Sequence, residues 1–330
     1  MSGHFRQGLV VGKFAPLHLG HEFVIHTALE RCDRVVLVSW ASPEPPGCET
    51  ARRERWLTLR FPQALRIVLP PTFEGLPQDH EPDAVHRAFV ARLCRMHGLE
   101  PDAVFTSEDY GEGFARELGA HLGRPVAHQM VDRARQRVPI SGTRLRAGIH
   151  PLRAFLHPQV YASFVERVAL LGGESTGKTV LARALARRWN TTWVPEYGRE
   201  LWVERGGQLR YEDFVSIGRT QVEWEERACL DANRYVFCDT TPLTTLFYGL
   251  DAWGRAEPEL WRLASRTYDR VLLCLPDFPF VQDGTRQGPE LRQRQHEWYR
   301  EALVERGMAW TEVGGTVEER VKAWKGGFSG

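Results

Sequence analysis

The stretch Gly172-Gly173-Glu174-Ser175-Thr176-Gly177-Lys178-Thr179 lies just past the middle of the 330-residue chain and decides the fold of its second half. It matches the pattern G-x-x-x-x-G-K-T, in which glycines let backbone amides wrap around phosphate groups. An apolar run at 168–171 precedes it and a predicted helix over 180–189 follows it, which is the context that the pattern requires. We therefore predict a P-loop in which every residue of the stretch contacts ATP, Lys178 bridges the β- and γ-phosphates, and Thr179 ligates Mg²⁺.

A second phosphate-handling signature, Gly12-Lys13-Phe14-Ala15-Pro16-Leu17-His18-Leu19-Gly20-His21, lies near the N-terminus. A predicted strand at 8–11 precedes it, and a predicted helix over 21–32 follows it. Backbone N–H groups at the start of a helix favour anions, and two imidazoles would add further donors there. On this loop Gly12, Lys13 and Phe14 are predicted to bind nucleotide, and His18 and His21 are predicted to be catalytic residues that bind its phosphates. Two histidines at this spacing also occur by chance, whereas a metal site is disfavoured because no third ligand lies nearby in sequence.

The stretch Ile140-Ser141-Gly142-Thr143-Arg144-Leu145-Arg146 predicts a partner for this loop. Ser141 is a suitable helix N-cap, so the stretch offers a helix N-terminus and two hydroxyl groups. Ser141, Thr143 and Arg146 are predicted to face the β- and γ-phosphates of ATP, while Arg144 should point elsewhere. Such a site suits nucleotidyl transfer, which depends on positioning the α-phosphate and stabilising charge more than on covalent help.

Strands and helices alternate along both halves of the chain, which is typical of parallel sheets covered by helices. In the first half the predicted strands are 8–11, 35–40, 66–69 and 103–106, and the predicted helices are 21–32, 50–59 and 83–97. In the second half the predicted strands are 168–171, 235–239 and 270–275. A short helical segment at 150–165 marks the joint. We therefore predict an α/β fold of two doubly wound parallel-sheet domains, a Rossmann-like nucleotidyltransferase over 1–162 and a P-loop kinase over 163–330.

The composition is that of an ordinary globular protein, with 42% hydrophobic and 26% charged residues and a net charge of +1. The near-neutral charge argues against nucleic-acid binding. Six cysteines without a C-x-x-C pair indicate neither a zinc site nor a disulfide framework. No apolar segment approaches the length of about 20 residues that crosses a membrane, so we expect a cytoplasmic protein without membrane insertion. A homo-oligomer is compatible with the sequence, which does not define the oligomeric state.

Two carboxylates of the second half are candidate catalytic residues. Asp239 ends the apolar run at 235–238 and suits a Mg²⁺ ligand, although it could instead cap the end of the strand. Glu196, within the segment 193–200, is the candidate general base or ribose anchor. A plain salt bridge is the alternative for Glu196, and Asp239 competes with it for the role of base.

The segment Gln282-Asp283-Gly284-Thr285-Arg286, together with Arg292 and Arg294, is predicted to form an arginine-bearing lid over ATP. Gly284 would serve as the hinge, and Arg286 and Arg292 would stabilise charge during transfer. A solvated helix face is the alternative. The segment 73–82 is a second candidate for a mobile loop over a ligand. The aromatic candidates for stacking on a substrate ring are Trp40, Trp193, Tyr197 and Trp202, and each of them could equally be a core residue.

The two signatures and their order resemble those of NadR-type bifunctional nicotinamide-mononucleotide adenylyltransferases and ribosylnicotinamide kinases. The first stretch and the Ser141–Arg146 pattern are similar to the adenylyltransferase half, and the P-loop, Pro195–Glu200 and Asp239 are similar to the kinase half. The resemblance implies phosphorylation of nicotinamide riboside to the mononucleotide (NMN), then adenylation to NAD, with ATP and Mg²⁺. Some relatives carry an N-terminal helix-turn-helix repressor domain, which we do not expect here because the first predicted strand begins by about Gly8.

Two other functions are compatible with the same motifs. The chain could be a NAD-responsive regulator whose sites sense nucleotides, or the same architecture could act on a different nucleoside-type acceptor. The near-neutral charge argues against a DNA-bound regulator.

Overall fold

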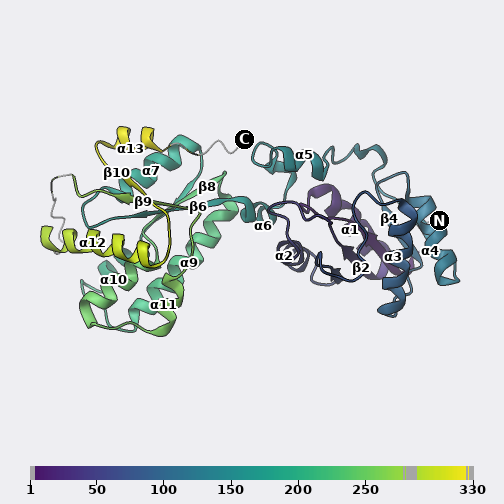
Figure 1. The fold of residues 1–330 in the computed structure, drawn as a ribbon, viewed down its shortest axis with the longest axis horizontal. Helices are drawn as coiled ribbons and strands as arrows, with labels where there is room; N and C mark the ends of the chain where they lie inside the picture. The colour runs from purple at the N-terminus through teal and green to yellow at the C-terminus, as the bar shows by residue number, and fades with distance from the viewer. Residues whose placement is uncertain (1–3, 278, 280–287, 325, 327–330) are drawn as a thin grey trace. The chain divides into compact units, whose positions relative to one another are not determined.

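The computed structural model describes residues 4–277, 279, 288–324 and 326, and the chain divides into two compact units, Met1–Phe164 and Val165–Gly330 (Figure 1). Each unit contains one five-stranded sheet, and every strand pairing in both sheets is parallel. The predicted fold class, two parallel-sheet α/β domains, is confirmed. Among the described residues, no helix combines the length and the apolar character needed to span a membrane.

The first unit alternates strands and helices throughout. Its elements are β1 (Phe5–Val11), α1 (Leu19–Arg31), β2 (Cys32–Ser39), α2 (Thr50–Arg60), β3 (Leu65–Val68), α3 (Asp83–Met96), β4 (Ala103–Thr106), α4 (Gly111–Leu122), β5 (Ala127–Met130), η1 (Arg133–Arg135), α5 (Gly142–Ala147), η2 (Arg153–Phe155), α6 (Pro158–Tyr161) and η3 (Ala162–Phe164). β1 begins earlier than its apolar core predicts, because the Asp102 carboxylate accepts hydrogen bonds from the backbone N–H groups of Arg6 and Gln7. The short strand β5 has only partly buried or exposed residues, so its sequence carries no apolar signal.

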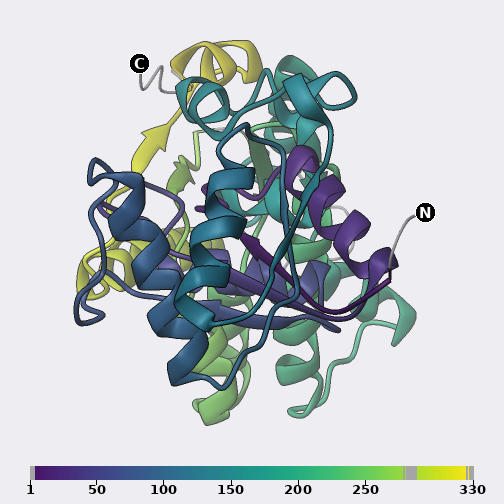
Figure 2. The same ribbon diagram turned by 90° about the vertical axis from the view of Figure 1, so that its right-hand side faces the viewer.

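The strand order of the first sheet is β3-β2-β1-β4-β5. The chain winds outward from β1 in one direction and then returns to continue from β4, so the order reverses between β1 and β4. Helices α3 and α4 pack together on one face, where Phe89, Val90 and Leu118 contact core residues of the strands. Figure 2 turns this unit toward the viewer and shows purple α1 well separated from the neighbouring blue helices α3 and α4. Ligands bind such sheets at the reversal point, beyond the carboxyl ends of the strands.

The second unit repeats the alternation with different connections. Its elements are β6 (Glu166–Leu171), α7 (Lys178–Trp189), β7 (Thr192–Val194), α8 (Tyr197–Glu204), α9 (Asp213–Asp231), β8 (Tyr235–Asp239), α10 (Pro242–Trp253), α11 (Pro258–Ala264), β9 (Arg270–Cys274), α12 (Pro289–Glu305), β10 (Thr311–Val313) and α13 (Val317–Ala323). The strand order is β10-β9-β6-β8-β7, which places β6 at the centre.

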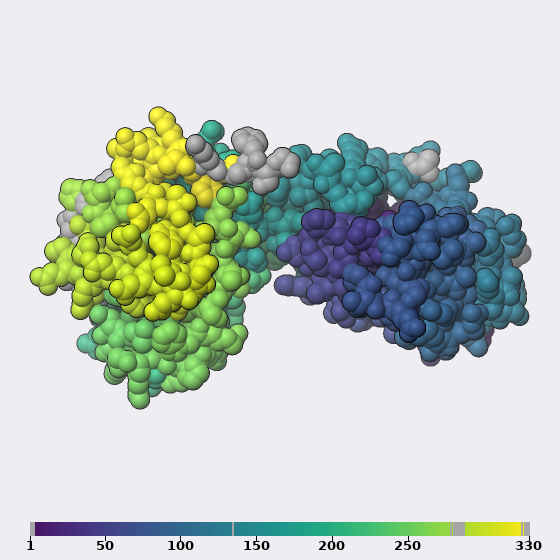
Figure 3. Space-filling view, in the orientation of Figure 1, coloured from purple at the N-terminus to yellow at the C-terminus, as the bar shows by residue number. Residues whose placement is uncertain are grey.

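The side chains of β6 alternate between the two faces of this sheet, as strand geometry requires. Val168 and Leu170 belong to the core cluster that contains α7, whereas Ala169 and Leu171 belong to the cluster that contains α10, α11 and α12. The green surface of α10 and α11 and the yellow surface of α12 form much of the face of this unit that Figure 3 presents. Both faces of the sheet are therefore covered, which explains why β6 reads as a continuous apolar run.

All six cysteines are buried free thiols: Cys32, Cys48, Cys94, Cys229, Cys238 and Cys274. Burial raises the pKa of each thiol, to about 11 for all but Cys238, whose pKa is raised well above its usual value. These side chains act as small apolar core residues.

Candidate functional site

A cavity of about 330 Å³ opens at the reversal point of the first sheet. Its lining comes from the ends of β1 and β4, from α1 and from the start of α5. The lining residues are Val10, Val11, Gly12, Lys13, Phe14, Ala15, His21, Val24, Phe105, Thr106, Ser107, Glu108, Tyr110, Arg135, Ser141, Gly142, Thr143 and Arg146. The structure therefore brings Gly12, Lys13, Phe14 and His21 together with Ser141, Thr143 and Arg146, although the two stretches are far apart in sequence.

His18 and His21 cap the N-terminus of α1 reciprocally. The backbone N–H of His21 donates to Nδ1 of His18 at 3.3 Å, and the backbone N–H of His18 donates to Nδ1 of His21 at 3.4 Å. The helix consequently begins at Leu19, not at His21 as the sequence predicts. The rings stack with centroids 3.6 Å apart. Because each Nδ1 accepts a hydrogen bond, each neutral ring carries its hydrogen on Nε2.

Both imidazoles are neutral at physiological pH. Burial, assisted by the positive charge of Arg135, lowers the pKa of His18 to about 4. Burial, the neighbouring His18 and Arg135 lower the pKa of His21 well below its usual value. The pair therefore adds no positive charge to the site at neutral pH, and the ring of His21 also hydrogen-bonds the Pro16 backbone. His21 lines the cavity, whereas His18 is buried and does not line it.

Arg146 joins the two sequence stretches directly. Its guanidinium donates to the carbonyl oxygen of Ala15 at 2.6 Å and to Oγ1 of Thr143 at 3.1 Å. Ser141 caps α5 by accepting a hydrogen bond from the backbone N–H of Arg144 at 3.2 Å. Arg144 does not line the cavity, as its spacing from Arg146 predicts.

Lys13 forms an ion pair with Asp79, a residue that the sequence analysis did not identify as part of the site. Its Nζ lies 2.8 Å from Oδ2 of Asp79, within the segment 73–82, and the backbone N–H of Asp79 donates to the carbonyl of Ser42 at 2.9 Å. Lys13, Asp79 and Trp40 also line a neighbouring cavity of about 380 Å³. The segment 73–82 thus forms part of a second compartment beside the first cavity.

The P-loop of the second unit connects β6 to α7. Gly172 has a φ of +139°, and a Cβ there would approach the Cys274 carbonyl oxygen to 2.7 Å, so only glycine fits. Nζ of Lys178 donates to the carbonyl oxygens of Gly172 at 2.9 Å and Gly173 at 3.0 Å. Oγ1 of Thr176 donates to the Gly173 carbonyl at 2.8 Å. The loop is thereby held around the space in which a phosphate would lie.

Thr179 and Asp239 meet at the start of α7, where the Thr179 hydroxyl donates to Oδ2 of Asp239. Asp239 is 2% exposed, and its Oδ1 is buried without a hydrogen-bond partner in the described part of the chain. A hydroxyl and a carboxylate with an unpartnered oxygen fit Mg²⁺, which usually takes one or two protein ligands together with substrate phosphates. Within that same part of the chain, no group of three or more His, Cys, Asp or Glu residues is arranged to hold a metal by itself.

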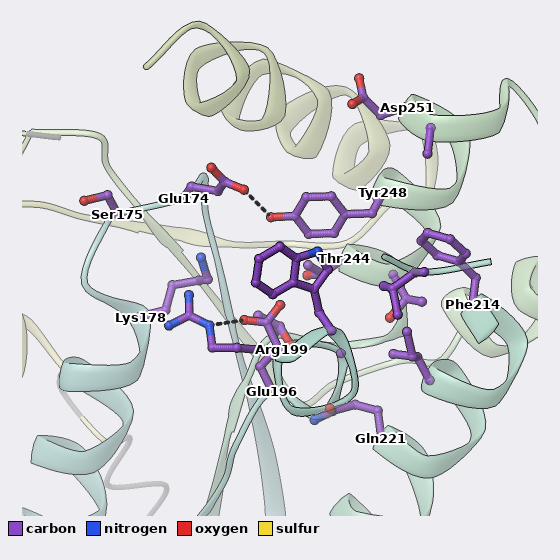
Figure 4. Close-up of a pocket in the computed structure, with 17 residues that line it drawn as sticks. Glu174, Ser175, Lys178, Glu196, Arg199, Phe214, Gln221, Thr244, Tyr248 and Asp251 are labelled. Carbon is purple, nitrogen blue, oxygen red and sulfur yellow. Dashed lines mark hydrogen bonds and ion pairs between the residues drawn. The ribbon is translucent and has the colours of Figure 1, made fainter. Parts of the chain in front are cut away.

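A cavity of about 260 Å³ lies beside the P-loop (Figure 4). The residues around it are Glu174, Ser175, Lys178, Glu196, Gly198, Arg199, Trp202, Leu209, Phe214, Ile217, Gln221, Thr240, Thr244, Thr245, Tyr248, Asp251 and Ala252. The Tyr248 hydroxyl donates to Oε1 of Glu174 at 3.1 Å, and Glu196 pairs with Arg199 at 4.0 Å. Glu196 lines this cavity and Asp239 does not, so the two candidate bases occupy different places.

Burial raises the pKa of the Glu196 carboxyl, and the positive charge of Lys178 opposes that shift. Burial likewise raises the pKa of Asp239, against the effects of Lys178 and of the hydrogen bond from Thr179. A carboxylate with a raised pKa that faces a cavity is suited to accept a proton.

Arg320 supports the P-loop from outside it, and sequence reasoning missed this contact. It is 1% exposed and comes from α13, where its guanidinium donates to the carbonyl oxygens of the P-loop residue Thr176 at 2.7 Å and of Leu275 at 3.3 Å. It also pairs with Asp277. A second support comes from α12, where Oε1 of Gln295 accepts a hydrogen bond from the backbone N–H of Glu174 at 3.0 Å.

The remaining predicted residues fall in three groups. Arg286 and the segment 282–286 lie outside the described residues. Arg292 lies against the P-loop, because a Cβ on Gly173 would approach the Arg292 carbonyl oxygen to 2.5 Å. Of the aromatic candidates, Trp40 and Trp202 line cavities, whereas Trp193 stacks with Arg183 and Tyr197 contacts Trp224.

The folds and the two loops define a two-domain protein that combines a nucleotidyltransferase-type α/β unit with a P-loop unit. A family model described as an AAA domain matches residues 167–320. The trifunctional NAD biosynthesis/regulator protein NadR of Escherichia coli K12 is 31% identical over 303 residues, which covers 84% of this chain and 71% of that protein. The chain therefore belongs to the NadR family.

Two solved structures show the same fold. A NadR protein in complex with NR superposes with a TM-score of 0.71 at 23% identity, covering 99% of this chain and 97% of the other. A NadR protein in complex with NAD and AMP-PNP superposes with a TM-score of 0.68 at 23% identity, covering 96% and 93%. The order of the two units is thus that of the family.

The buried histidine makes the first unit sensitive to acid. The unfolded chain protonates His18 near pH 6.5, whereas the folded chain does so only near pH 4, so lowering the pH through this window should reduce the free energy of unfolding by up to about 3 kcal/mol. His18→Asn replaces the capping Nδ1 by an amide oxygen, which can also cap a helix, and does not titrate. Hydrogen exchange of the α1 amides, measured in both proteins at about pH 7 and about pH 4.5, reports the protection of this helix. On lowering the pH, protection should decrease more in the wild type than in His18→Asn. Equal losses would contradict this account.

Replacing Arg320 should destabilise the second unit. Arg320→Met leaves buried carbonyl oxygens without their donor and should lower the free energy of unfolding by about 3 kcal/mol. The matched control is Arg300→Met, since Arg300 forms an exposed ion pair with Glu312 at 3.5 Å and should cost less than about 0.5 kcal/mol. Urea unfolding followed by tryptophan fluorescence reports mainly on this unit, which holds nine of the eleven tryptophans. If Arg320→Met and Arg300→Met lower the free energy of unfolding by similar amounts, Arg320 does not stabilise the second unit through these buried hydrogen bonds.

Proposed function

We propose that the chain is a bifunctional ATP-dependent enzyme that phosphorylates nicotinamide riboside to NMN and then adenylates NMN to NAD, releasing pyrophosphate. The observation that carries this proposal is that each unit has its own phosphate-binding loop beside its own cavity. Membership of the NadR family supports it, as do the molecules bound in the two solved NadR structures. The two reactions use different phosphorus atoms of ATP and so require different sites.

In the first unit the triphosphate of ATP lies against the N-terminus of α1. Nε2–H groups of His18 and His21, with Arg146 and Thr143, donate to its oxygens and stabilise the charge that develops. A phosphate oxygen of NMN attacks the α-phosphorus, the bond from that phosphorus to the bridging oxygen breaks, and pyrophosphate leaves with the electron pair. Trp40 and Lys13 of the neighbouring cavity are placed to receive NMN, the indole against the cationic pyridinium ring.

In the second unit ATP binds the P-loop from Gly172 to Thr179, and nicotinamide riboside enters the cavity lined by Trp202 and Glu196. The ribose 5′-hydroxyl attacks the γ-phosphorus, Glu196 accepts its proton, and ADP leaves with the electrons of the broken bond. This assignment gives Glu196 the role of base and leaves Asp239 beside Thr179 for the metal.

Thr179 and Asp239 would hold Mg²⁺, which when bound neutralises charge on the β- and γ-phosphates. Lys178 would leave its contacts with Gly172 and Gly173 and donate to the same phosphates. Arg286 and Arg292 would stabilise negative charge on the phosphate during its transfer.

Separate substitutions should separate the two activities. Lys178→Ala should reduce formation of NMN from nicotinamide riboside and Mg²⁺-ATP by roughly 100-fold or more, because a charge on the transferred phosphate loses its partner. His21→Ala should reduce formation of NAD from NMN by roughly 10- to 100-fold. Each variant should keep the other activity, measured by product chromatography.

Lys322→Ala and His97→Ala are matched controls, since both side chains are exposed and lie on α13 and at the end of α3. Both should retain both activities. If the wild type forms neither NMN nor NAD, the sites serve as sensors; if either active-site substitution removes both activities in a folded protein, the two sites are not independent.

A further inference from the structure

Two ion pairs connect the loop after β4 with η1 at the mouth of the first cavity. Arg135 pairs with Glu108, and Arg133 pairs with Asp109 at 3.0 Å. Both arginines come from η1, and both acids lie between β4 and α4. Neither arginine belongs to the motifs from which the site was predicted.

The two pairs differ in where they lie. Arg133 and Asp109 have side chains that are 74% and 76% exposed, and neither residue lines the cavity. Arg135 and Glu108 are 42% and 43% exposed, and both line the cavity with His21 and Arg146. The first pair is therefore an ordinary surface contact, whereas the second is part of the site.

The backbone holds both members of the second pair in place. Arg135 has a φ of +53°, a conformation that non-glycine residues seldom adopt, and its N–H donates to the Asp132 carbonyl at 2.9 Å. The Asp132 carboxylate accepts the next N–H groups, those of Arg137 at 2.9 Å and Val138 at 3.2 Å. On the opposite side, Oγ1 of Thr106 donates to the Glu108 carbonyl at 3.1 Å.

The charges explain why this pair matters for a phosphate ligand. Glu108 is the only carboxylate among the described residues that line the first cavity, where it would repel a triphosphate. Arg135 lies close enough to both histidines for its charge to contribute to their lowered pKa values. A carboxylate and a phosphate present similar pairs of oxygens to a guanidinium, so they compete for the same donors.

We propose that Arg135 binds the triphosphate of ATP in the first unit, and that Glu108 holds Arg135 in the free chain and is displaced when the nucleotide binds. The inference rests on the proposed adenylyl transfer for its substrate. Arg135 serves ATP and not the acceptor, because neither Arg135 nor Glu108 lines the neighbouring cavity that contains Trp40 and Asp79. Glu108 thereby sets the affinity for ATP without contacting it in the bound state.

The test uses substitutions that should act in opposite directions. Arg135→Gln should raise the KM for ATP in NAD formation by roughly 10- to 100-fold, because a charge-assisted hydrogen bond is lost. Glu108→Gln should lower that KM by roughly two- to fivefold, because Arg135 no longer has a charged competitor. A pair that only stabilises the fold would shift both variants toward weaker binding.

Arg133→Gln and Asp109→Asn are the matched controls and should change the KM for ATP less than about twofold. The kcat for NAD formation, which depends on a folded first unit, and thermal unfolding of each variant check that this unit is intact. Shifts of the same sign for Arg135→Gln and Glu108→Gln, or equal effects of the control pair, would overturn the proposal.

A binding measurement distinguishes failure of the proposed adenylyl transfer from failure of the proposed role of Arg135. In the Lys178→Ala background, which weakens nucleotide binding to the second unit, calorimetric titration with AMP-PNP reports on the first unit. Weaker binding by Arg135→Gln and tighter binding by Glu108→Gln would support the role of Arg135 even if the chain forms no NAD. Unchanged or equally weakened binding would refute it.

Discussion

In each unit the candidate site lies at the start of the helix that follows the central strand, β1 in the first unit and β6 in the second. In a parallel sheet all strands end at the same edge. The chain continues to one side of β1 and β6 and later returns to the other side, so the loops after these two strands lie where the connections lead apart. The positive end of the helix dipole lies there with donors that the helix cannot use. The placement of the two cavities beside these loops follows from this geometry.

The two units complete this common arrangement with different side chains. In the first unit Nδ1 of His18 and Nδ1 of His21 each accept a hydrogen bond from the other residue's backbone N–H, and burial keeps both rings neutral, so the pair contributes little charge. In the second unit Lys178 supplies a full charge on a flexible chain, close enough to Asp239 and Glu196 to oppose the rise in the pKa of each carboxyl. Fixed neutral donors suit a phosphate that must be held still, whereas a mobile cation suits one that is transferred.

The sequence predicted the features that rest on local pattern. Both candidate loops could be predicted because their strand and helix flanks are contiguous with them, and Arg146 was preferred to Arg144 because it matches the spacing of the family that the sequence resembles. Contacts between distant segments could not be predicted in this way. Arg135 meets Glu108 only because β4 and β5 pair, Lys13 meets Asp79 because an irregular segment returns to β1, and Arg320 reaches Thr176 from the far end of the chain. The short strands β5, β7 and β10 were missed because none of them is a buried apolar run.

The buried thiols described above have a practical consequence. Protonated and shielded by the core, all six native cysteines should be poor nucleophiles toward maleimides and mild oxidants. A single cysteine introduced on the surface of each unit would then be the preferred site of a dye or spin label. The spacing of the two catalytic halves during turnover could be followed spectroscopically without first removing any residue from the interior.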